Sequence, residues 1–251
     1  MSSYTKGQLT IVGLGPGDPS LLTLAAVKAI KEASVVAFPV SATGGESLAL
    51  KIASDWITTG QKKIPLTFPM VADVELRKIA WSLSSDQLAK EVSKGEQVVF
   101  LCQGDSSLFA TSSYLLLALK FNYPNCPVNI IPGINSFSAA AAVSQLPLGF
   151  QQEQLLIVPI PSKKETLETL LREVVEKRRI LVLLKLGQKW IWVRPLLDEM
   201  NLLEDSVFAQ RIGFDDQKVM KARDVPQSEC PYFSLLIIRQ TWPDVLPEAY
   251  L

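Results

Sequence analysis

The sequence predicts a two-domain α/β protein, with a parallel sheet in the first domain and a mixed-sheet α+β second domain. Three observations lead to this prediction. The chain has 251 residues, which is long for one domain and sufficient for two. Apolar runs alternate with helix-patterned segments through residue 147, which is typical of a parallel sheet covered on both faces. Beyond residue 147 fewer helices separate the strands, which favours a mixed or largely antiparallel sheet.

The first domain, residues 7–147, is expected to alternate strands with helices. Asp18 suits the N-cap of the first helix, Leu24 is assigned to its inward face, and Pro39 is expected to end the second strand. The predicted strands cover residues 9–14, 35–38, 63–66, 97–103 and 128–131. The predicted helices cover residues 19–33, 47–57, 74–94, 112–121 and 136–145.

The second domain, residues 148–251, is expected to follow a linker at residues 146–154. Residues 218–225 are expected to add a strand or a turn. The other predicted strands cover residues 155–159, 180–186, 207–211 and 232–239, and the predicted helices cover residues 165–177 and 192–199.

The composition narrows the function classes. The chain has no histidine, which excludes a Ser-His-Asp triad, a Cys-His pair and the common zinc enzyme sites. Its 25 basic and 25 acidic residues give no net charge, which disfavours a nucleic-acid partner. Cys102, Cys126 and Cys230 are too widely spaced for a disulfide framework or a metal site.

The apolar segments predict neither export nor membrane insertion. No charged segment precedes an apolar core at the amino end, so no signal peptide is expected. No apolar run approaches the roughly 20 residues that a membrane helix needs. We therefore expect a cytoplasmic protein without a membrane partner.

Three glycine-containing turns follow predicted strands. They are Gly-Leu-Gly-Pro-Gly-Asp at 13–18, Gln-Gly-Asp-Ser-Ser-Leu-Phe at 103–109, and Pro-Gly-Ile-Asn-Ser-Phe at 132–137. Glycine allows positive φ and lets a ligand approach the backbone closely. Asp105 is expected either to cap the next helix or to face a hydroxyl or ammonium group of a ligand. Since all three turns follow parallel strands, we expect them at the carboxyl edge of one sheet, where α/β proteins bind ligands.

The first turn is not the dinucleotide-binding fingerprint. Asp18 stands where the last glycine of Gly-x-Gly-x-x-Gly would be. The second predicted strand ends in Ala-Phe-Pro at 37–39, without the acidic residue that holds ribose hydroxyl groups. The sequence therefore argues against a Rossmann dehydrogenase and against the common Rossmann-like methyltransferases.

In this order and spacing, the three turns resemble those of the tetrapyrrole methylase family, and the resemblance spans essentially the whole chain. It implies a class III methyltransferase that binds S-adenosylmethionine in a cleft between two domains, and a homodimer. Where Ser106 follows the Gly-Asp pair, the family usually has proline. By position, the implied cofactor contacts are Pro16, Gln103, Gly104, Asp105, Leu108, Asn135, Ser136, Leu186 and Gly213.

Within the family, the sequence resembles most the methyltransferases that act on C-20 of precorrin-2 or cobalt-factor II in vitamin B12 biosynthesis. The supporting segments are Phe-Pro at 38–39, Ser-Leu-Ala at 47–49, Phe-Pro-Met at 68–70, Leu-Lys-Leu-Gly at 184–187 and Tyr-Phe-Ser-Leu-Leu at 232–236. Uroporphyrinogen methylases carry aspartate where Pro39 stands. Other acceptors remain open, namely another corrin-ring position, diphthine or ribosomal RNA, as does a non-catalytic tetrapyrrole-binding module.

The methyl transfer that the resemblance implies depends more on the relative position of donor and acceptor than on acid–base groups of the protein. Methyl transfer from a sulfonium to an electron-rich ring carbon is an in-line displacement, so no protein base is expected and no catalytic residue is assigned. No protein metal site is expected, and any cobalt would belong to the substrate. Candidates for pairing with the substrate's carboxylates are Lys185, Lys189, Arg194 and Arg211, and candidates for packing against its ring are Phe38, Phe68 and Met70.

Overall fold

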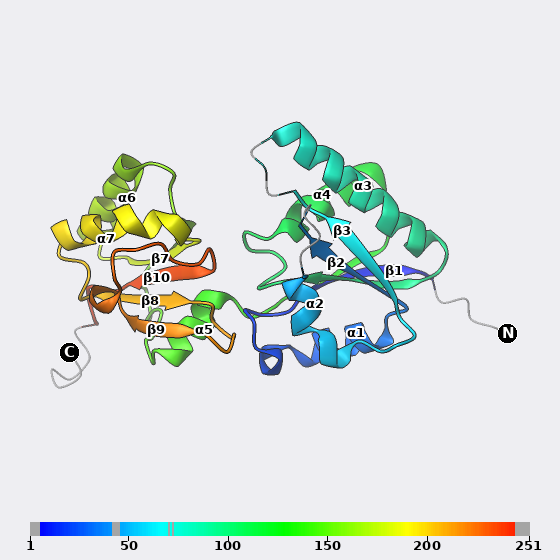
Figure 1. The fold of residues 1–251 in the computed structure, drawn as a ribbon, viewed down its shortest axis with the longest axis horizontal. Coiled ribbons are helices and arrows are strands. Elements are labelled where there is room, and N and C mark those ends of the chain that lie inside the picture. The colour runs from blue at the N-terminus through cyan, green and yellow to red at the C-terminus, as the bar shows by residue number, and fades with distance from the viewer. Residues whose placement is uncertain (1–5, 42–45, 70, 72, 244–251) are drawn as a thin grey trace. The chain divides into compact units, whose positions relative to one another are not determined.

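The computed structural model describes residues 6–41, 46–69, 71 and 73–243. Contacts divide the chain into two units, Met1–Asn135 and Ser136–Leu251, and each unit has its own five-stranded sheet (Figure 1). Within the described ranges, no helix is long and apolar enough to cross a membrane.

The first unit contains a parallel sheet in the order β3-β2-β4-β1-β5, which confirms the predicted sheet type. Helices α1 and α2 cover one face of this sheet, and α3 and α4 cover the other (Figure 1). The strands are β1 (Gln8–Gly13), β2 (Val35–Val40), β3 (Lys62–Thr67), β4 (Gln97–Cys102) and β5 (Val128–Ile131). The helices are α1 (Leu24–Glu32), α2 (Leu48–Ile52), α3 (Val74–Ser93) and α4 (Thr111–Asn122).

The helix predicted at 19–33 is two elements. Asp18 caps a single 3₁₀ turn, Pro19–Leu21, because its Oδ1 accepts a hydrogen bond from the Ser20 N–H at 2.8 Å. The α-helix begins only after Thr23, whose Oγ1 accepts from the Ala26 N–H at 3.1 Å. Because the α-helix starts anew at Leu24, the side of the helix that faces the sheet differs from the one predicted for a single helix over 19–33. The inward assignment of Leu24 is therefore wrong, since its side chain is 90% exposed while Ala26 is buried.

The second strand does not end at Pro39. β2 continues to Val40, and Pro39 pairs in register with Leu66 of β3. Pairing of β2 with β4 stops at Ala37, opposite Phe100. Beyond that point β2 pairs only with β3. The missing N–H of Pro39 therefore costs no hydrogen bond to β4.

The second unit contains a mixed sheet in the order β6-β7-β10-β8-β9, as predicted. Only the β6–β7 pair is parallel among the pairings described for this sheet. The strands are β6 (Leu155–Pro159), β7 (Ile180–Leu184), β8 (Ser206–Gln210), β9 (Lys218–Lys221) and β10 (Ser234–Ile238). Helices α6 (Lys164–Glu176) and α7 (Trp190–Glu199) lie on one face of the sheet (Figure 1).

Helix α5 (Ser136–Val143) corrects the predicted domain boundary. The prediction placed it in the first domain, which was expected to end at residue 147. In the structure α5 contacts β10 and belongs to the second unit. Its alanines 139–141 are buried, and their small side chains let the helix lie close to the strand.

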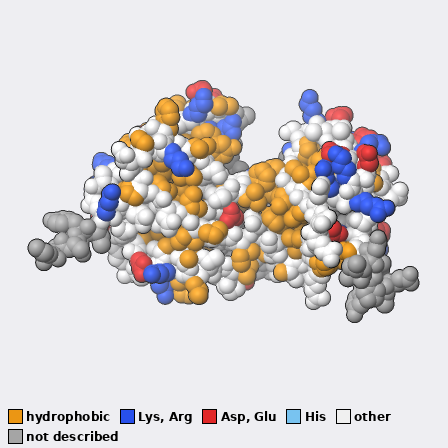
Figure 2. Space-filling view, turned by 180° about the vertical axis from the view of Figure 1, so that it is seen from behind, with side chains coloured by type: hydrophobic (Ala, Val, Ile, Leu, Met, Phe, Trp, Pro, Cys, Tyr) orange, Lys and Arg blue, Asp and Glu red, His pale blue; other side chains and the backbone are white. Residues whose placement is uncertain are grey.

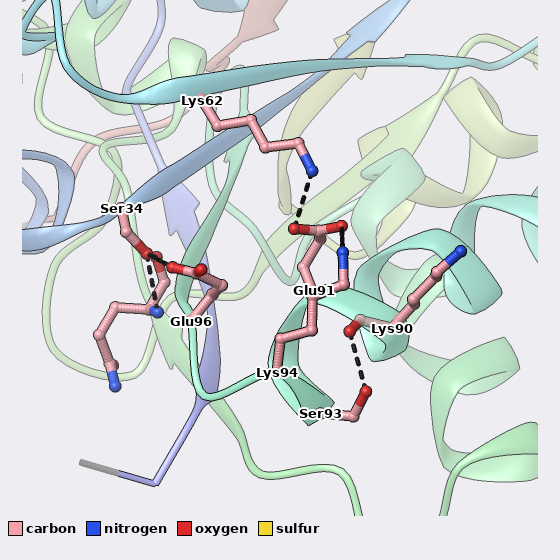
Figure 3. A network of polar contacts seen from close by, with 8 residues as sticks. Ser34, Lys62, Lys90, Glu91, Ser93, Lys94 and Glu96 are labelled. Atoms are coloured by element: carbon pink, nitrogen blue, oxygen red, sulfur yellow. Dashed lines mark hydrogen bonds and ion pairs between the residues drawn. The ribbon is translucent and has the colours of Figure 1, made fainter. Parts of the chain in front are cut away.

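A polar network ties together the amino edge of the first sheet (Figure 3). Glu91 of α3 lies between Lys94, at 2.7 Å, and Lys62 at the start of β3, at 2.9 Å. Its side chain is only 7% exposed, whereas both lysines are about half exposed. Beside it, the Ser34 hydroxyl donates to the carboxylate of Glu96 just before β4. Through the Glu91–Lys62 pair, the network attaches helix α3 to strand β3.

We expect Glu91→Gln to lower the free energy of unfolding at neutral pH by about 1 kcal/mol, because the two lysines lose their shared carboxylate. The hydrogen bond from Lys94, and then that from Lys62, lowers the pKa of Glu91 below its ordinary value of 4.5. A lowered pKa in the folded state adds stability above 4.5 that disappears as the pH falls through the folded-state pKa. Urea unfolding at neutral and acidic pH measures both effects.

Glu173→Gln is the matched control. Glu173 also accepts from two cations, Lys177 at 2.7 Å and Arg179 at 2.8 Å, but its side chain is 43% exposed. We expect it to change stability less than Glu91→Gln, because water screens the pairs. Equal stability of Glu91→Gln and wild type at neutral pH would contradict the assignment of Glu91 as a structural tie.

Candidate functional site

The candidate site lies where the strand order of the first sheet reverses. β1 and β4 are neighbours, but the chain runs from β1 toward β2 on one side and from β4 toward β5 on the other. Ligands of open α/β sheets bind at the carboxyl ends of strands at such a switch point. The turn after β1 and the loop after β4 flank it, as the three-turn prediction requires.

The three turns meet through their glycines. A Cβ on Gly13 would lie 2.5 Å from the Gly133 nitrogen and 3.0 Å from the Gly104 oxygen. A Cβ on Gly133 would collide with that same oxygen of Gly104. Since β4, β1 and β5 are adjacent strands, their exits are only about one strand spacing apart. The turns therefore pack backbone against backbone.

Two backbone hydrogen bonds join the first and second turns. The Gly15 N–H donates to the Gly104 oxygen at 3.1 Å, and the Gly104 N–H donates to the Gly15 oxygen at 2.8 Å. Both residues have positive φ, +75° and +77°, which glycine adopts without strain. A Cβ on Gly104 would meet no described atom within 4 Å. The open side of Gly104 thus lets a ligand reach the backbone.

Asp105 joins the second turn to the third, and it does not cap the next helix. Its Oδ2 accepts from the Gly133 N–H at 2.9 Å, and its Oδ1 accepts from the Ser107 N–H at 2.8 Å. Helix α4 begins instead after Ala110, which offers no side-chain cap. Each carboxylate oxygen of Asp105 therefore has a backbone partner, and the residue fixes loop geometry.

Ser106 performs a tethering role at the position where the family usually has proline. It is buried, and its hydroxyl donates to the Ile131 oxygen at the end of β5, at 2.9 Å. The Ser112 hydroxyl donates to the Ser106 oxygen at 2.7 Å. Sequence reasoning missed Ser112, since a serine in the first turn of a helix has no distinctive pattern. These bonds hold the loop with side chains instead of a proline ring.

The remaining predicted contacts of the first unit lie in the same turns. The Gln103 side-chain amide donates to the Pro16 oxygen at 3.3 Å, which brings these two predicted residues together. Leu108 lies in the second loop and Asn135 in the third turn, and both are partly buried. Beside Leu108, Phe109 is 45% exposed with φ +50°, a conformation that non-glycine residues rarely adopt.

The three predicted contacts of the second unit are Ser136, Leu186 and Gly213. Ser136 is the first residue of α5. Leu186 follows β7 and Gly213 follows β8, and both strands flank β10 with their carboxyl ends at one edge of the sheet. Positive φ values gather at this edge, at Lys185 (+62°), Gly187 (+52°), Arg211 (+49°) and Gly213 (+82°). Positive φ is strained for Lys185 and Arg211, which are not glycine, and strained backbone is concentrated at functional sites.

The basic residues predicted to pair with substrate carboxylates differ in their surroundings. Lys189 donates to the backbone oxygens of Ile160 and Pro161, at 3.3 and 3.2 Å. Arg194 donates to the oxygens of Val225 and Arg223, at 2.8 and 3.1 Å. These two side chains are used within the fold of the second unit.

Arg211 and Lys185 lie at the edge that contains the positive φ values. Arg211 pairs with Asp216 at 2.7 Å and lies over the Phe214 ring. Its hydrogen bond lowers the pKa of Asp216, so the pair is ionised and locally neutral. Lys185 directly follows β7 at this edge. Of the four predicted cations, these two remain as candidates.

The aromatic residues predicted to face a ring system belong to the core. Phe38 and Phe68 are both buried, and the Phe68 ring packs against Phe100 with a centroid distance of 5.8 Å. Core packing therefore accounts for both residues. Met70 lies outside the described residues.

The chemistry available at the three turns is that of a binding surface. Burial raises the pKa of the nearby Cys102 thiol, which keeps it protonated at neutral pH and unsuited to attack. Among the residues that the structure describes, no three acidic or cysteine side chains gather into a group that could hold a metal ion. Backbone groups and the Gln103 amide thus dominate the edge, which suits positioning of a bound molecule.

Two known proteins of similar sequence are named as C(20)-methyltransferases. The cobalt-precorrin-2 C(20)-methyltransferase of Salmonella typhimurium is 28% identical over 241 residues, which cover 94% of this chain and 98% of that protein. The precorrin-2 C(20)-methyltransferase of a Sinorhizobium species is 26% identical over 252 residues, covering 97% and 99%.

A solved structure shares the fold. The uroporphyrin-III C-methyltransferase of Thermus thermophilus, complexed with S-adenyl homocysteine, has a TM-score of 0.62 and 22% identity. The likeness covers 93% of this chain and 98% of that one. The model of the tetrapyrrole (corrin/porphyrin) methylases matches residues 8–224, which include all three turns and both sheet edges described above. The chain therefore belongs to the tetrapyrrole methylase family and is a methyltransferase.

Proposed function

We propose that this protein transfers a methyl group from S-adenosylmethionine to C-20 of precorrin-2 or cobalt-factor II in cobalamin biosynthesis. One observation carries the proposal: two relatives named as C-20 methyltransferases match nearly the whole chain and nearly their own full length. Proline at position 39 also favours this acceptor over uroporphyrinogen, for which the resembling enzymes carry aspartate there.

The three turns of the first unit fit the proposed cofactor. A methionine moiety carries an ammonium and a carboxylate group, and a nucleoside carries hydroxyl groups, all of which hydrogen-bond to backbone. The open side of Gly104 offers backbone to such groups without a side chain in the way. Pro16, Gln103, Gly104, Asp105, Leu108 and Asn135 are the proposed contacts of this unit, and Ser136, Leu186 and Gly213 those of the second.

The protein's proposed contribution to the reaction is orientation. S-adenosylmethionine supplies an electrophilic methyl group on a sulfonium that leaves as a neutral thioether. The turn residues hold the donor in a fixed position, which makes an in-line attack by a ring carbon more frequent. The residues need not form a covalent bond, since the attacking carbon is already electron-rich. A chain without histidine and with a protonated thiol at the site suits this chemistry.

The decisive experiment incubates the protein with labelled S-adenosylmethionine and with either precorrin-2 or cobalt-factor II. We expect one added methyl group, located at C-20 by mass and NMR analysis of the product. The faster substrate would identify whether the acceptor is metal-free or contains cobalt. Cofactor binding without transfer to either acceptor would reject C-20 and favour another ring position or another acceptor.

A substitution of Asp105 tests the cofactor site separately from the acceptor. Asp105→Ala removes the carboxylate that accepts from the Gly133 N–H, so this hydrogen bond no longer joins the second and third turns. We expect S-adenosylmethionine to bind about tenfold more weakly or worse, which corresponds to the loss of one charge-assisted hydrogen bond. Isothermal titration calorimetry without acceptor measures this affinity.

Asp73→Ala is the matched control for Asp105→Ala. Asp73 also accepts from two backbone N–H groups, those of Glu75 and Leu76, but it caps α3 and joins no turns. We expect it to lower thermal stability and to leave cofactor affinity unchanged. If Asp105→Ala binds the cofactor as tightly as wild type, the proposed cofactor site is wrong.

A further inference from the structure

Two large aromatic side chains are exposed at the edge of the second sheet that contains the positive φ values. Tyr232 is 45% exposed and Phe233 is 40% exposed. They directly precede β10, which is antiparallel to β7 and β8, so they lie beside the carboxyl ends of those two strands. The Tyr232–Phe233 pair is therefore at the same edge as the turns that contain Leu186 and Gly213.

Backbone contacts attach the Tyr232–Phe233 pair to both neighbouring turns. On the side of β8, the Arg211 N–H donates to the Phe233 oxygen at 2.7 Å. On the side of β7, the Gly187 N–H donates to the hydroxyl of Ser234 at 3.3 Å, and a Cβ on Gly187 would lie 3.7 Å from the Cα of Tyr232. The backbone of the pair thus has a fixed place between the two turns.

The two rings pack on each other and not into the core. Their centroids are 5.3 Å apart with an interplanar angle of 76°, the edge-to-face arrangement that aromatic rings favour. The core of the second unit has its own aromatic contact, between the buried rings of Trp190 and Phe208. Figure 2 shows hydrophobic side chains gathered on one part of the second unit and charged ones on another. Apolar groups that are exposed together at a cleft edge mark ligand-binding surfaces.

We propose that the Tyr232–Phe233 pair is the surface on which the acceptor macrocycle lies during methyl transfer. This placement rests on the proposed function only for the class of acceptor, a tetrapyrrole, and not on which ring carbon receives the methyl group. The macrocycle is a large ring system with apolar faces, which two exposed aromatic rings can cover. Phe38 and Phe68, which the sequence suggested for this contact, are both buried and cannot reach a ligand in the same way.

Arg211 supplies a cation beside the pair for the carboxylates around such a macrocycle. Both of its hydrogen bonds to Asp216 use Nε, at 2.7 Å, and its side chain is 29% exposed. A guanidinium has further N–H donors on its two terminal nitrogens, and these can bind a second carboxylate. The guanidinium also lies over the Phe214 ring, 4.6 Å from the centroid, which holds it at this edge.

The cofactor is the other molecule that could cover the pair. Adenine and the methionine moiety bind through hydrogen bonds, which the backbone groups at Leu186 and Gly213 can provide. The faces of the Tyr232 and Phe233 rings offer apolar contact area and no hydrogen bond. The pair therefore suits the faces of the macrocycle better than the polar groups of the cofactor.

The double variant Tyr232→Ala/Phe233→Ala tests the placement through binding. Absorption titration of the full chain with cobalt-factor II, and separately with uroporphyrin III, measures macrocycle affinity, with S-adenosylhomocysteine in place of the methyl donor. We expect the affinity for whichever macrocycle wild type binds to fall about tenfold or more, because two ring contacts are lost. Tyr232→Phe keeps both rings, and we expect it to bind the macrocycle like wild type.

Calorimetry with S-adenosylmethionine alone separates the two candidate occupants. We expect the double variant to bind the cofactor within about twofold of the wild-type affinity, since exposed side chains contribute little to the fold. An equal loss of cofactor and macrocycle affinity would overturn the placement. Wild-type macrocycle affinity in the double variant, or no binding of either macrocycle by the wild-type protein, would also overturn it.

Val175→Ala is the matched control. Val175 is also 40% exposed and belongs to the second unit, but it lies near the end of α6, beside the amino end of β7 and so at the opposite edge of the sheet. We expect it to leave macrocycle affinity unchanged. Macrocycle binding that depends on the Tyr232–Phe233 pair, without methyl transfer to C-20, would reject the proposed function and still support the placement.

Discussion

The close approach of three backbone turns at Gly13, Gly104 and Gly133 determines the geometry of the whole candidate site. The turns leave three adjacent parallel strands, so the space between them admits no side chain at Gly13 or Gly133. With the backbones in contact, Asp105 accepts a hydrogen bond from the Gly133 N–H just after β5, and the Ser106 hydroxyl donates one to the Ile131 oxygen at the end of β5. These bonds attach the loop after β4 to the end of β5 and leave one side of Gly104 open to a ligand.

The two units present different kinds of surface. The first presents backbone groups at the carboxyl edge of a parallel sheet. The second presents a sheet edge where Lys185, Gly187, Arg211 and Gly213 all have positive φ. Neither edge relies on a group that must change its ionisation. This suits a transfer in which the donor is already activated and correct placement supplies the rate.

The sequence predicted those elements whose residue pattern follows directly from burial or from backbone geometry. Buried parallel strands appear in a sequence as apolar runs, so β1 and β4 and the glycine turns that follow them were predictable. The prediction of a helix start failed where two nearby residues were equally suitable as the N-cap. Both Asp18 and Thr23 are good N-caps, and only the structure shows that the second one starts α1. The role of Asp105 depends on Gly133, 28 residues away, and such a partner has no local signal.

The strand order of the first sheet has a consequence for how the chain folds during synthesis. β1 is made first, yet Gln8 pairs with Gln97 of β4, and Leu9 pairs with Val128 of β5. Neither neighbour of β1 exists until most of the unit has left the ribosome, whereas β2 and β3 can pair early. Pairings this distant in sequence slow folding and leave apolar strands exposed meanwhile. The contacts of Gly133 with Gly13 and Gly104 can form only at the last of these steps, when β5 docks.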